Sequence, residues 1–226
     1  MISNPELLSQ LRKVLRAEIG DTIWVQSPID EKTKLRFEVR IDGWDASNIQ
    51  WTILSEQTYE QAKWTKWMII AMPNKREKIE MIVQKLTECG MDQILFWPSE
   101  RSVIRDRNTK KEERLQKIIK EAVEQSRGWK LPKVGFTTKP KEIVWSANLI
   151  IFDKGWNPEK WKNEEKPDRP LTLWLYWLIW PEGGFTYKDY QTFEGTKYDI
   201  YGLWETVLRT ETAAIVWGWL IQNNGL

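Results

Sequence analysis

The chain has 226 residues and a formal net charge of +2, from 34 lysines and arginines against 32 aspartates and glutamates, so total charge alone does not indicate a polyanionic partner. This length suits one large domain or two modest ones. A single cysteine, Cys89, and the absence of histidine exclude an internal disulfide framework and a multi-cysteine metal site. We therefore expect a reducing, cytoplasmic location and no bound metal.

The sequence also argues against a membrane protein. The first residues, MISNPELLSQLRK, contain no apolar core of the kind that a signal peptide needs. The longest strongly apolar run, residues 171–180, is about half the roughly 20 residues that a membrane-spanning helix requires. We expect this run to be a buried strand and expect no association with a membrane.

Residues 1–62 are predicted to form a small β-rich module. Three short segments rich in β-branched or aromatic residues, 22–26, 34–40 and 48–54, are separated by turn-forming pairs such as Asp42-Gly43. This spacing is typical of a small barrel or sandwich. The polar residues 55–66 are expected to link this module to the rest of the chain.

Residues 63–226 are predicted to form an α/β domain with a mostly parallel sheet, because strand-like and helix-like patterns alternate. The expected strands are residues 67–72, 93–97, 148–153, 171–179 and 198–203. The expected helices are residues 75–89, 112–126 and 210–222. Gly90 stands where the first of these helices should be capped.

Two stretches concentrate positive charge. Residues 101–117 are dense in arginine and lysine, and residues 127–141 contain five basic residues and no acidic one. Such blocks can contact phosphates of a nucleic acid. The alternative interpretation is an ordinary solvated helix face followed by a surface loop.

Two loops in the carboxyl-terminal half carry the strongest functional signal. The strand 171–179 ends in Trp-Pro-Glu-Gly-Gly-Phe, residues 180–185, and the strand 198–203 ends in Trp-Glu-Thr-Val-Leu-Arg-Thr-Glu-Thr, residues 204–212. Ligands of open α/β sheets bind at the carboxyl ends of strands. Paired glycines such as Gly183 and Gly184 let the main chain approach a ligand closely. These two loops are therefore the candidate ligand site.

Both loops resemble motifs of the SPOUT class of methyltransferases, and within it of the family that methylates N3 of a uridine in 16S ribosomal RNA. That family has a Leu-Ile-Gly-Pro-Glu-Gly-Gly-Phe loop, and a Leu-Gly-x-x-x-Leu-Arg-Thr-Glu-Thr-Ala segment before its last helix. Residues 78–90 resemble its first helix, residues 99–102 match its Ser-Glu-Arg-Ser motif, and residues 124–126 match its Glu-Gln-Ser motif. The similarity extends over nearly the whole chain.

The resemblance implies a PUA-like barrel over residues 1–62, which helps to hold RNA, and a SPOUT methyltransferase domain over residues 63–226 with a carboxyl-terminal trefoil knot. It further implies a homodimer that binds S-adenosyl-L-methionine and acts on 16S ribosomal RNA or the small ribosomal subunit. The segment before Val14 is shorter than in the family. The barrel is therefore expected to lack an edge strand, unless the sequence begins late.

The resemblance also implies roles for individual residues. The cofactor would be bound, largely through main-chain contacts, by Leu178, Ile179, Trp180, Gly183, Gly184, Leu203, Trp204, Val207 and Leu208. Candidates for RNA contacts are Arg16, Arg101, Arg105 and Arg127. In the family an arginine follows the Glu-Gln-Ser motif after one intervening residue, whereas Arg127 follows Ser126 directly. This difference puts the role of Arg127 in doubt.

Arg209 is the candidate catalytic residue. Its guanidinium can bind a uracil carbonyl and stabilise the negative charge that develops as N3 loses its proton. The alternative is a structural arginine paired with Glu205 or Glu211. Because the chain has no histidine, imidazole cannot be the base, and Glu205, Glu211 and water remain open.

Two loop residues depart from the family pattern. Trp180 and Trp204 stand where the family has glycine, and an indole is expected to obstruct a cofactor there. The chain has 16 tryptophans and 12 glycines, fewer glycines than an average usage of about 7% predicts. We hypothesise that both codons are UGA read as glycine in the source organism; UGG at both positions would refute this.

Two other functions stay open at the level of sequence. Other SPOUT enzymes modify transfer RNA, so the substrate can differ while the chemistry is kept. A non-catalytic RNA-binding protein, with Trp180 and Trp204 filling the cofactor site, would explain the same residues without any reaction.

Overall fold

The computed structural model describes residues 8–26, 33–45, 48–60, 65–103, 109–144, 148–152, 174–201 and 207–223. The chain divides into two compact units, Met1–Ala62 and Lys63–Leu226. None of the helices in the described ranges is long and apolar enough to cross a membrane.

The first unit contains an antiparallel sheet with the strand order β1-β2-β3. It is formed by β1 (Thr22–Gln26), β2 (Thr33–Trp44) and β3 (Ile49–Glu60), preceded by a short π-helical turn, η1 (Gln10–Val14). Its core is a cluster of leucines and isoleucines from β2, β3, η1 and the residues just before η1: Leu8, Leu11, Ile41 and Ile49. A β-rich first module was predicted, and the strands confirm it.

Two boundaries in this unit were predicted wrongly. The pair Asp42-Gly43 does not end a strand, because β2 continues to Trp44 with a shift of register between Ile41 and Gly43. A β-bulge of this kind accommodates a glycine within a strand. The polar residues 55–60 are strand rather than linker, because β3 pairs with β2 as far as Glu60. An exposed strand can be polar throughout, so composition alone did not identify it.

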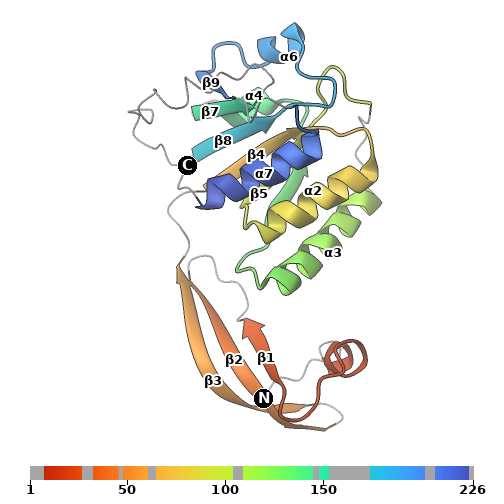
Figure 1. Cartoon of the computed structure of the whole chain (residues 1–226), viewed down its shortest axis with the longest axis vertical. Helices are drawn as coiled ribbons and strands as arrows, with labels where there is room; N and C mark the ends of the chain where they lie inside the picture. Colours follow the sequence, from red (N-terminus) through yellow and green to blue (C-terminus); the bar gives the residue numbers. More distant parts are fainter. Residues whose placement is uncertain are drawn as a thin grey trace. The chain divides into compact units, whose positions relative to one another are not determined.

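The second unit is an α/β domain around a parallel sheet with the strand order β6-β5-β4-β8-β7-β9 (Figure 1). Its strands are β4 (Thr65–Ala71), β5 (Gln93–Trp97), β6 (Lys133–Phe136), β7 (Asn148–Phe152), β8 (Trp174–Ile179) and β9 (Tyr198–Tyr201). Its helices are α2 (Arg76–Glu88), α3 (Thr109–Ser126), α4 (Pro140–Val144), α6 (Tyr187–Gln191) and α7 (Thr210–Asn223). All strand pairs in it are parallel.

Helices cover both faces of this sheet, which explains why its central strands are apolar on both sides. Side chains of β8 alternate between two core clusters: Trp177 and Ile179 belong to the one with α2, α3 and α7, whereas Tyr176 and Leu178 belong to the one with α4 and Phe193. Figure 1 shows α2, α3 and α7 side by side on one face. The predicted parallel α/β domain is confirmed; β6, α4 and α6 are short elements that the sequence patterns did not predict.

Helix α7 lies close against α2. A Cβ atom added to Gly218 would come within 2.4 Å of Leu86 Cδ2, so this glycine allows the close approach of the two helices. The ring of Trp217 stacks on Phe152, with 3.6 Å between ring centroids. At the end of α7, Gln222 donates a hydrogen bond to the Gly90 carbonyl at 2.7 Å. Gly90 itself has a φ of +78° and ends α2 as predicted.

Candidate functional site

The candidate site lies at the carboxyl edge of the parallel sheet. Strand β4 is the first strand of the domain, and the chain places β5 on one side of it and β8 on the other. The loops that leave adjacent strands in opposite directions open a crevice at such a point, where α/β proteins bind ligands. The Pro-Glu-Gly-Gly loop follows β8 at this point, next to the residues that follow β4.

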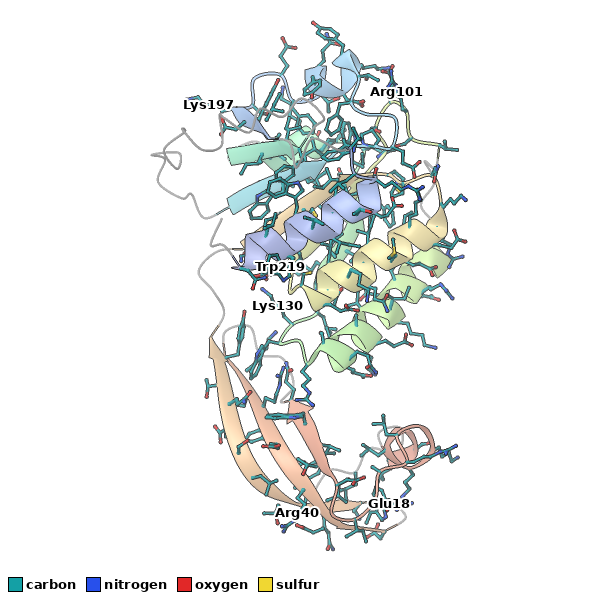
Figure 2. The ribbon with its side chains drawn as sticks, viewed as in Figure 1. Glu18, Arg40, Arg101, Lys130, Lys197 and Trp219 are labelled. Atoms are coloured by element: carbon teal, nitrogen blue, oxygen red, sulfur yellow. The ribbon has the colours of Figure 1, made fainter. Side chains whose placement is uncertain are left out.

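The loop after β8 is a tight turn held by its neighbours. Gly184 has a φ of +74°, a conformation that favours glycine, and its N–H donates to the Pro181 carbonyl at 2.8 Å. The Arg101 guanidinium donates a hydrogen bond to the Gly183 carbonyl. A Cβ atom on Gly183 would lie 2.9 Å from Arg101 Cδ. The glycine therefore leaves the space in which the arginine side chain lies. Figure 2 shows Arg101 at this edge of the domain.

The Ser-Glu-Arg-Ser motif after β5 joins three strand ends. Ser99 and Ser102 are buried, their hydroxyl oxygens lie 3.0 Å apart, and Ser102 donates to the Met72 carbonyl just after β4. The Glu100 N–H donates to the Asp189 carboxylate at 2.8 Å. Asp189 also closes the capping box of α6 with Thr186. Through Asp189, the motif therefore fixes helix α6, which follows the loop after β8.

The second motif segment enters α7. Residues 202–206, which include the predicted cofactor residues Leu203 and Trp204 and the candidate base Glu205, lie outside the described residues. After them, Val207 and Arg209 are exposed, and Leu208 packs against the core cluster beneath α7. Helix α7 begins with Thr210, and Ala213 N–H donates to the Arg209 carbonyl at 2.8 Å.

Thr210 and Glu211 are the polar residues of this segment that are buried. Thr210 is fully buried and Glu211 is 6% exposed. Within the described part of the chain, Thr210 Oγ1 and Glu211 Oε2 have no hydrogen-bond partner. Buried polar atoms are normally satisfied, so such a pair at the carboxyl edge of a parallel sheet, where α/β proteins bind ligands, is a functional signal. Glu211 was considered from the sequence only as a base or as an ion-pair partner.

Lys78 connects the two loops and was not singled out from the sequence. Its ammonium on α2 binds the Glu182 carboxylate, and its Nζ lies 3.4 Å from Glu211 Oε1. The hydrogen bond to Glu182 raises the pKa of Lys78, and Glu211 adds to this against the cost of burial. No local pattern marks a lysine in the first turn of a helix as functional, because its partners lie far away in the sequence.

Three predicted cofactor residues are buried side chains. Leu178 and Ile179 are fully buried on opposite faces of β8. Only their main chain can therefore meet a ligand at the strand end. Trp180 is 3% exposed, and its indole packs in the core cluster beneath α7. If Trp180 obstructs the cofactor as expected from the sequence, it does so with an indole that is packed in the protein interior directly after β8.

Comparison with known proteins decides the family. Residues 60–222 match the RNA methyltransferase domain family. The chain belongs to this family. The match covers the whole parallel sheet, both motif loops and all but the last described residue of α7.

Relatives of this methyltransferase-domain protein include two bacterial proteins named ribosomal RNA small subunit methyltransferase E. The protein of Mesomycoplasma hyopneumoniae is 29% identical over 150 residues, covering 62% of each chain. The protein of Bacillus subtilis is 30% identical over 153 residues, covering 62% of this chain and 59% of the relative. The match thus spans less than two thirds of these relatives.

A solved structure of similar fold is that of ribosomal RNA small subunit methyltransferase E from Neisseria gonorrhoeae bound to S-adenosyl methionine. It is 22% identical, the alignment covers 99% of this chain and 91% of that chain, and the TM-score is 0.75. The predicted fold, an α/β domain with a parallel sheet after a small β-rich unit, is confirmed. The trefoil knot stays a prediction.

The predicted RNA-binding arginines lie on different parts of the chain. Arg101 follows the carboxyl end of β5, whereas Arg127 follows α3, which returns the chain to the amino end of β6. In a parallel sheet these are opposite edges. Arg127 is exposed with a φ of +53°. Arg16, exposed with a φ of +50°, belongs to the first unit, and Arg105 lies outside the described residues.

Proposed function

We propose that the chain transfers a methyl group from S-adenosyl-L-methionine to N3 of a uridine in 16S ribosomal RNA. Family membership supports RNA methylation, and both bacterial relatives carry the name of a small-subunit ribosomal RNA methyltransferase. The observation that carries the proposal is the meeting of the Pro-Glu-Gly-Gly loop and the start of α7 at Lys78. Two segments with the family's motifs thereby share one edge of the sheet.

The residues at this edge fit the methyl donor. Thr210 Oγ1 and Glu211 Oε2 are buried acceptors without a partner among the described residues, and the ammonium and ribose hydroxyls of the donor are hydrogen-bond donors. The turn has no side chain of its own at Gly183 and Gly184, and the Arg101 side chain lies in the space beside Gly183. We propose that the donor binds at Leu178, Ile179, Trp180, Gly183, Gly184, Leu203, Trp204, Val207 and Leu208.

The donor, when bound, supplies an electrophilic methyl group. We propose that Arg209, exposed at the entrance to α7, binds a carbonyl of the uracil and stabilises the negative charge that develops as N3 loses its proton. Glu205, Glu211 or water would accept that proton.

For the RNA, we propose contacts to Arg101 near the site, to Arg105, and to Arg16 in the β-rich first unit, which would act as a PUA-like RNA holder. Arg127 is a weaker candidate because it lies at the opposite sheet edge from Arg101. We also propose that the protein works as a homodimer in the cytoplasm and acts on the small ribosomal subunit or its RNA. Among the described residues no cluster of His, Cys, Asp and Glu is suited to a metal ion.

The test is mass mapping of 16S ribosomal RNA after incubation with the full chain and the methyl donor. A parallel reaction uses the variant with Trp180→Gly and Trp204→Gly. We expect N3-methyluridine at one position of the RNA. The Arg209→Ala variant should not form it, and the exposed control Lys197→Ala should form it as before. Methylation of transfer RNA instead would change the substrate. RNA binding without donor binding in both chains would favour the non-catalytic alternative.

A further inference from the structure

Lys78 is the residue through which helix α2 contacts both motif loops. It lies in the first turn of α2 (Arg76–Glu88), which starts after β4, and its ammonium binds the Glu182 carboxylate of the loop after β8. The same ammonium lies 3.4 Å from Glu211 Oε1, in the first turn of α7. A lysine ammonium has three N–H donors and no acceptor, so it can serve two carboxylates at once.

The burial of Glu211 distinguishes this group from an ordinary surface ion pair. The side chains of Lys78, Glu182 and Glu211 are 20%, 27% and 8% exposed. A carboxylate as buried as that of Glu211 requires a charged partner, because an isolated buried charge is strongly destabilising. Of the described residues, Lys78 is the cation that forms an ion pair with it. Exposed pairs elsewhere on α2, such as Lys85 with Glu88, join residues of the same helix and contribute little.

The ammonium satisfies only part of Glu211. One carboxylate oxygen, Oε1, faces Lys78, and the other, Oε2, is buried without a partner in the described residues. The neighbouring Thr210 Oγ1 is in the same condition. Meanwhile the loop that carries Glu182 is held on its other side by the hydrogen bond from Arg101 to the Gly183 carbonyl. Lys78 therefore fixes the spacing between a tethered loop and a pair of unsatisfied acceptors.

We propose that Lys78 is a positioning residue for the methyl-donor site: it holds the loop after β8 and the first turn of α7 together, and it orients Glu211 so that Oε2 is available to the donor. This inference rests on the proposed function. Lys78 does not touch the reacting atoms, so its loss is expected to raise the KM for the donor much more than it lowers kcat.

The experiment compares Lys78→Met, which keeps the length and removes the charge, with Lys78→Arg, which keeps the charge. Lys85→Met is the matched control, because Lys85 lies on the same helix and pairs within it. Calorimetry with the methyl donor is done on the full chain and on its Trp180→Gly, Trp204→Gly variant, in whichever background binds. We expect about tenfold weaker binding in Lys78→Met, rescue to within about threefold in Lys78→Arg, and no change in Lys85→Met.

Amide hydrogen exchange of the free protein supplies a readout that does not need the donor. Lys78→Met is expected to increase the rate of amide exchange both at residues 182–184 and at residues 211–213. Lys85→Met is expected to change the rate at neither segment. If both backgrounds fail to bind the donor, the proposed function fails, and the exchange data still decide whether Lys78 joins the loops. Unchanged donor affinity in Lys78→Met, or faster exchange confined to α2, would overturn the positioning role.

Discussion

The loop after β8 and the segment that enters α7 lie at the same sheet edge but are held in different ways. The first is held by hydrogen bonds made directly to the loop and to the helix that follows it: Arg101 binds the Gly183 carbonyl, Lys78 binds Glu182, and Asp189 accepts a hydrogen bond from the Glu100 N–H. The second, within the described residues, is tied at Glu211 and otherwise depends on how α7 packs on α2. A single site can thus combine a loop fixed by its own contacts with one placed by a distant helix interface.

The largest expected effect is at Trp180, where the first loop begins. Trp180→Ala removes an indole that is 3% exposed in the core cluster, and we expect a loss of about 3–5 kcal/mol in the free energy of unfolding. Trp219→Ala is the matched control, because Trp219 is 56% exposed on α7. Urea denaturation of both variants checks this. A loss below about 1 kcal/mol at Trp180 would mean that its space belongs to a ligand pocket rather than to the core.

The second prediction concerns the helix that carries the second segment. Gly218→Ala places a Cβ atom 2.4 Å from Leu86 Cδ2, so we expect destabilisation of about 1–3 kcal/mol through overpacking. At an exposed helix position the same change would stabilise the protein by roughly 1 kcal/mol. Amide exchange should quicken at residues 210–213, and Val216→Ala on the exposed face should leave it unchanged. A stabilised Gly218→Ala protein would show that α7 is not held by this contact.

The third prediction separates the two loops. Arg101→Ala removes the donor to the Gly183 carbonyl, which we expect to cost about 0.5–1.5 kcal/mol. Amide exchange should increase at residues 182–184 and stay unchanged at residues 211–213. Lys197→Ala, another exposed cation of the domain shown in Figure 2, is the control. Equal increases in both segments would contradict the distinction between local and remote support.

The smallest effect is a pH dependence away from both loops, on the surface between α2 and α3. Hydrogen bonds from Arg114 lower the pKa of Glu80 below its ordinary 4.5, with further help from Arg76. A lowered folded-state pKa means that the stabilisation is present above pH 4.5 and is lost as the pH falls through the lowered value. Glu80→Gln should therefore destabilise the protein slightly at pH 7 and no longer do so at a pH below the lowered pKa of Glu80, as measured by denaturation. A difference that persists in acid would contradict the ion pair.

Sequence alone was sufficient for the features that depend on local pattern. Apolar periodicity predicted α2 and α3, continuous apolar runs predicted β4 and β8, and Gly90 marked the end of α2. The loop motifs predicted the family through their resemblance to its own motifs, and the family match confirms that prediction. The short elements β6, α4 and α6 escaped because four or five residues contain too little periodicity to be distinguished from loop.

Only the tertiary structure revealed how the site is held. Nothing in the order of residues says that Lys78 meets Glu182 and Glu211, since the parallel sheet brings these segments together across long connections. Nor could charge patterns show that Arg101 and Arg127 lie at opposite sheet edges, because that follows from the return path of α3. The sequence by itself determined which residues form the motif loops; the packing of the sheet and α7 determined which of them meet, because ion pairs and buried acceptors depend on distance in space.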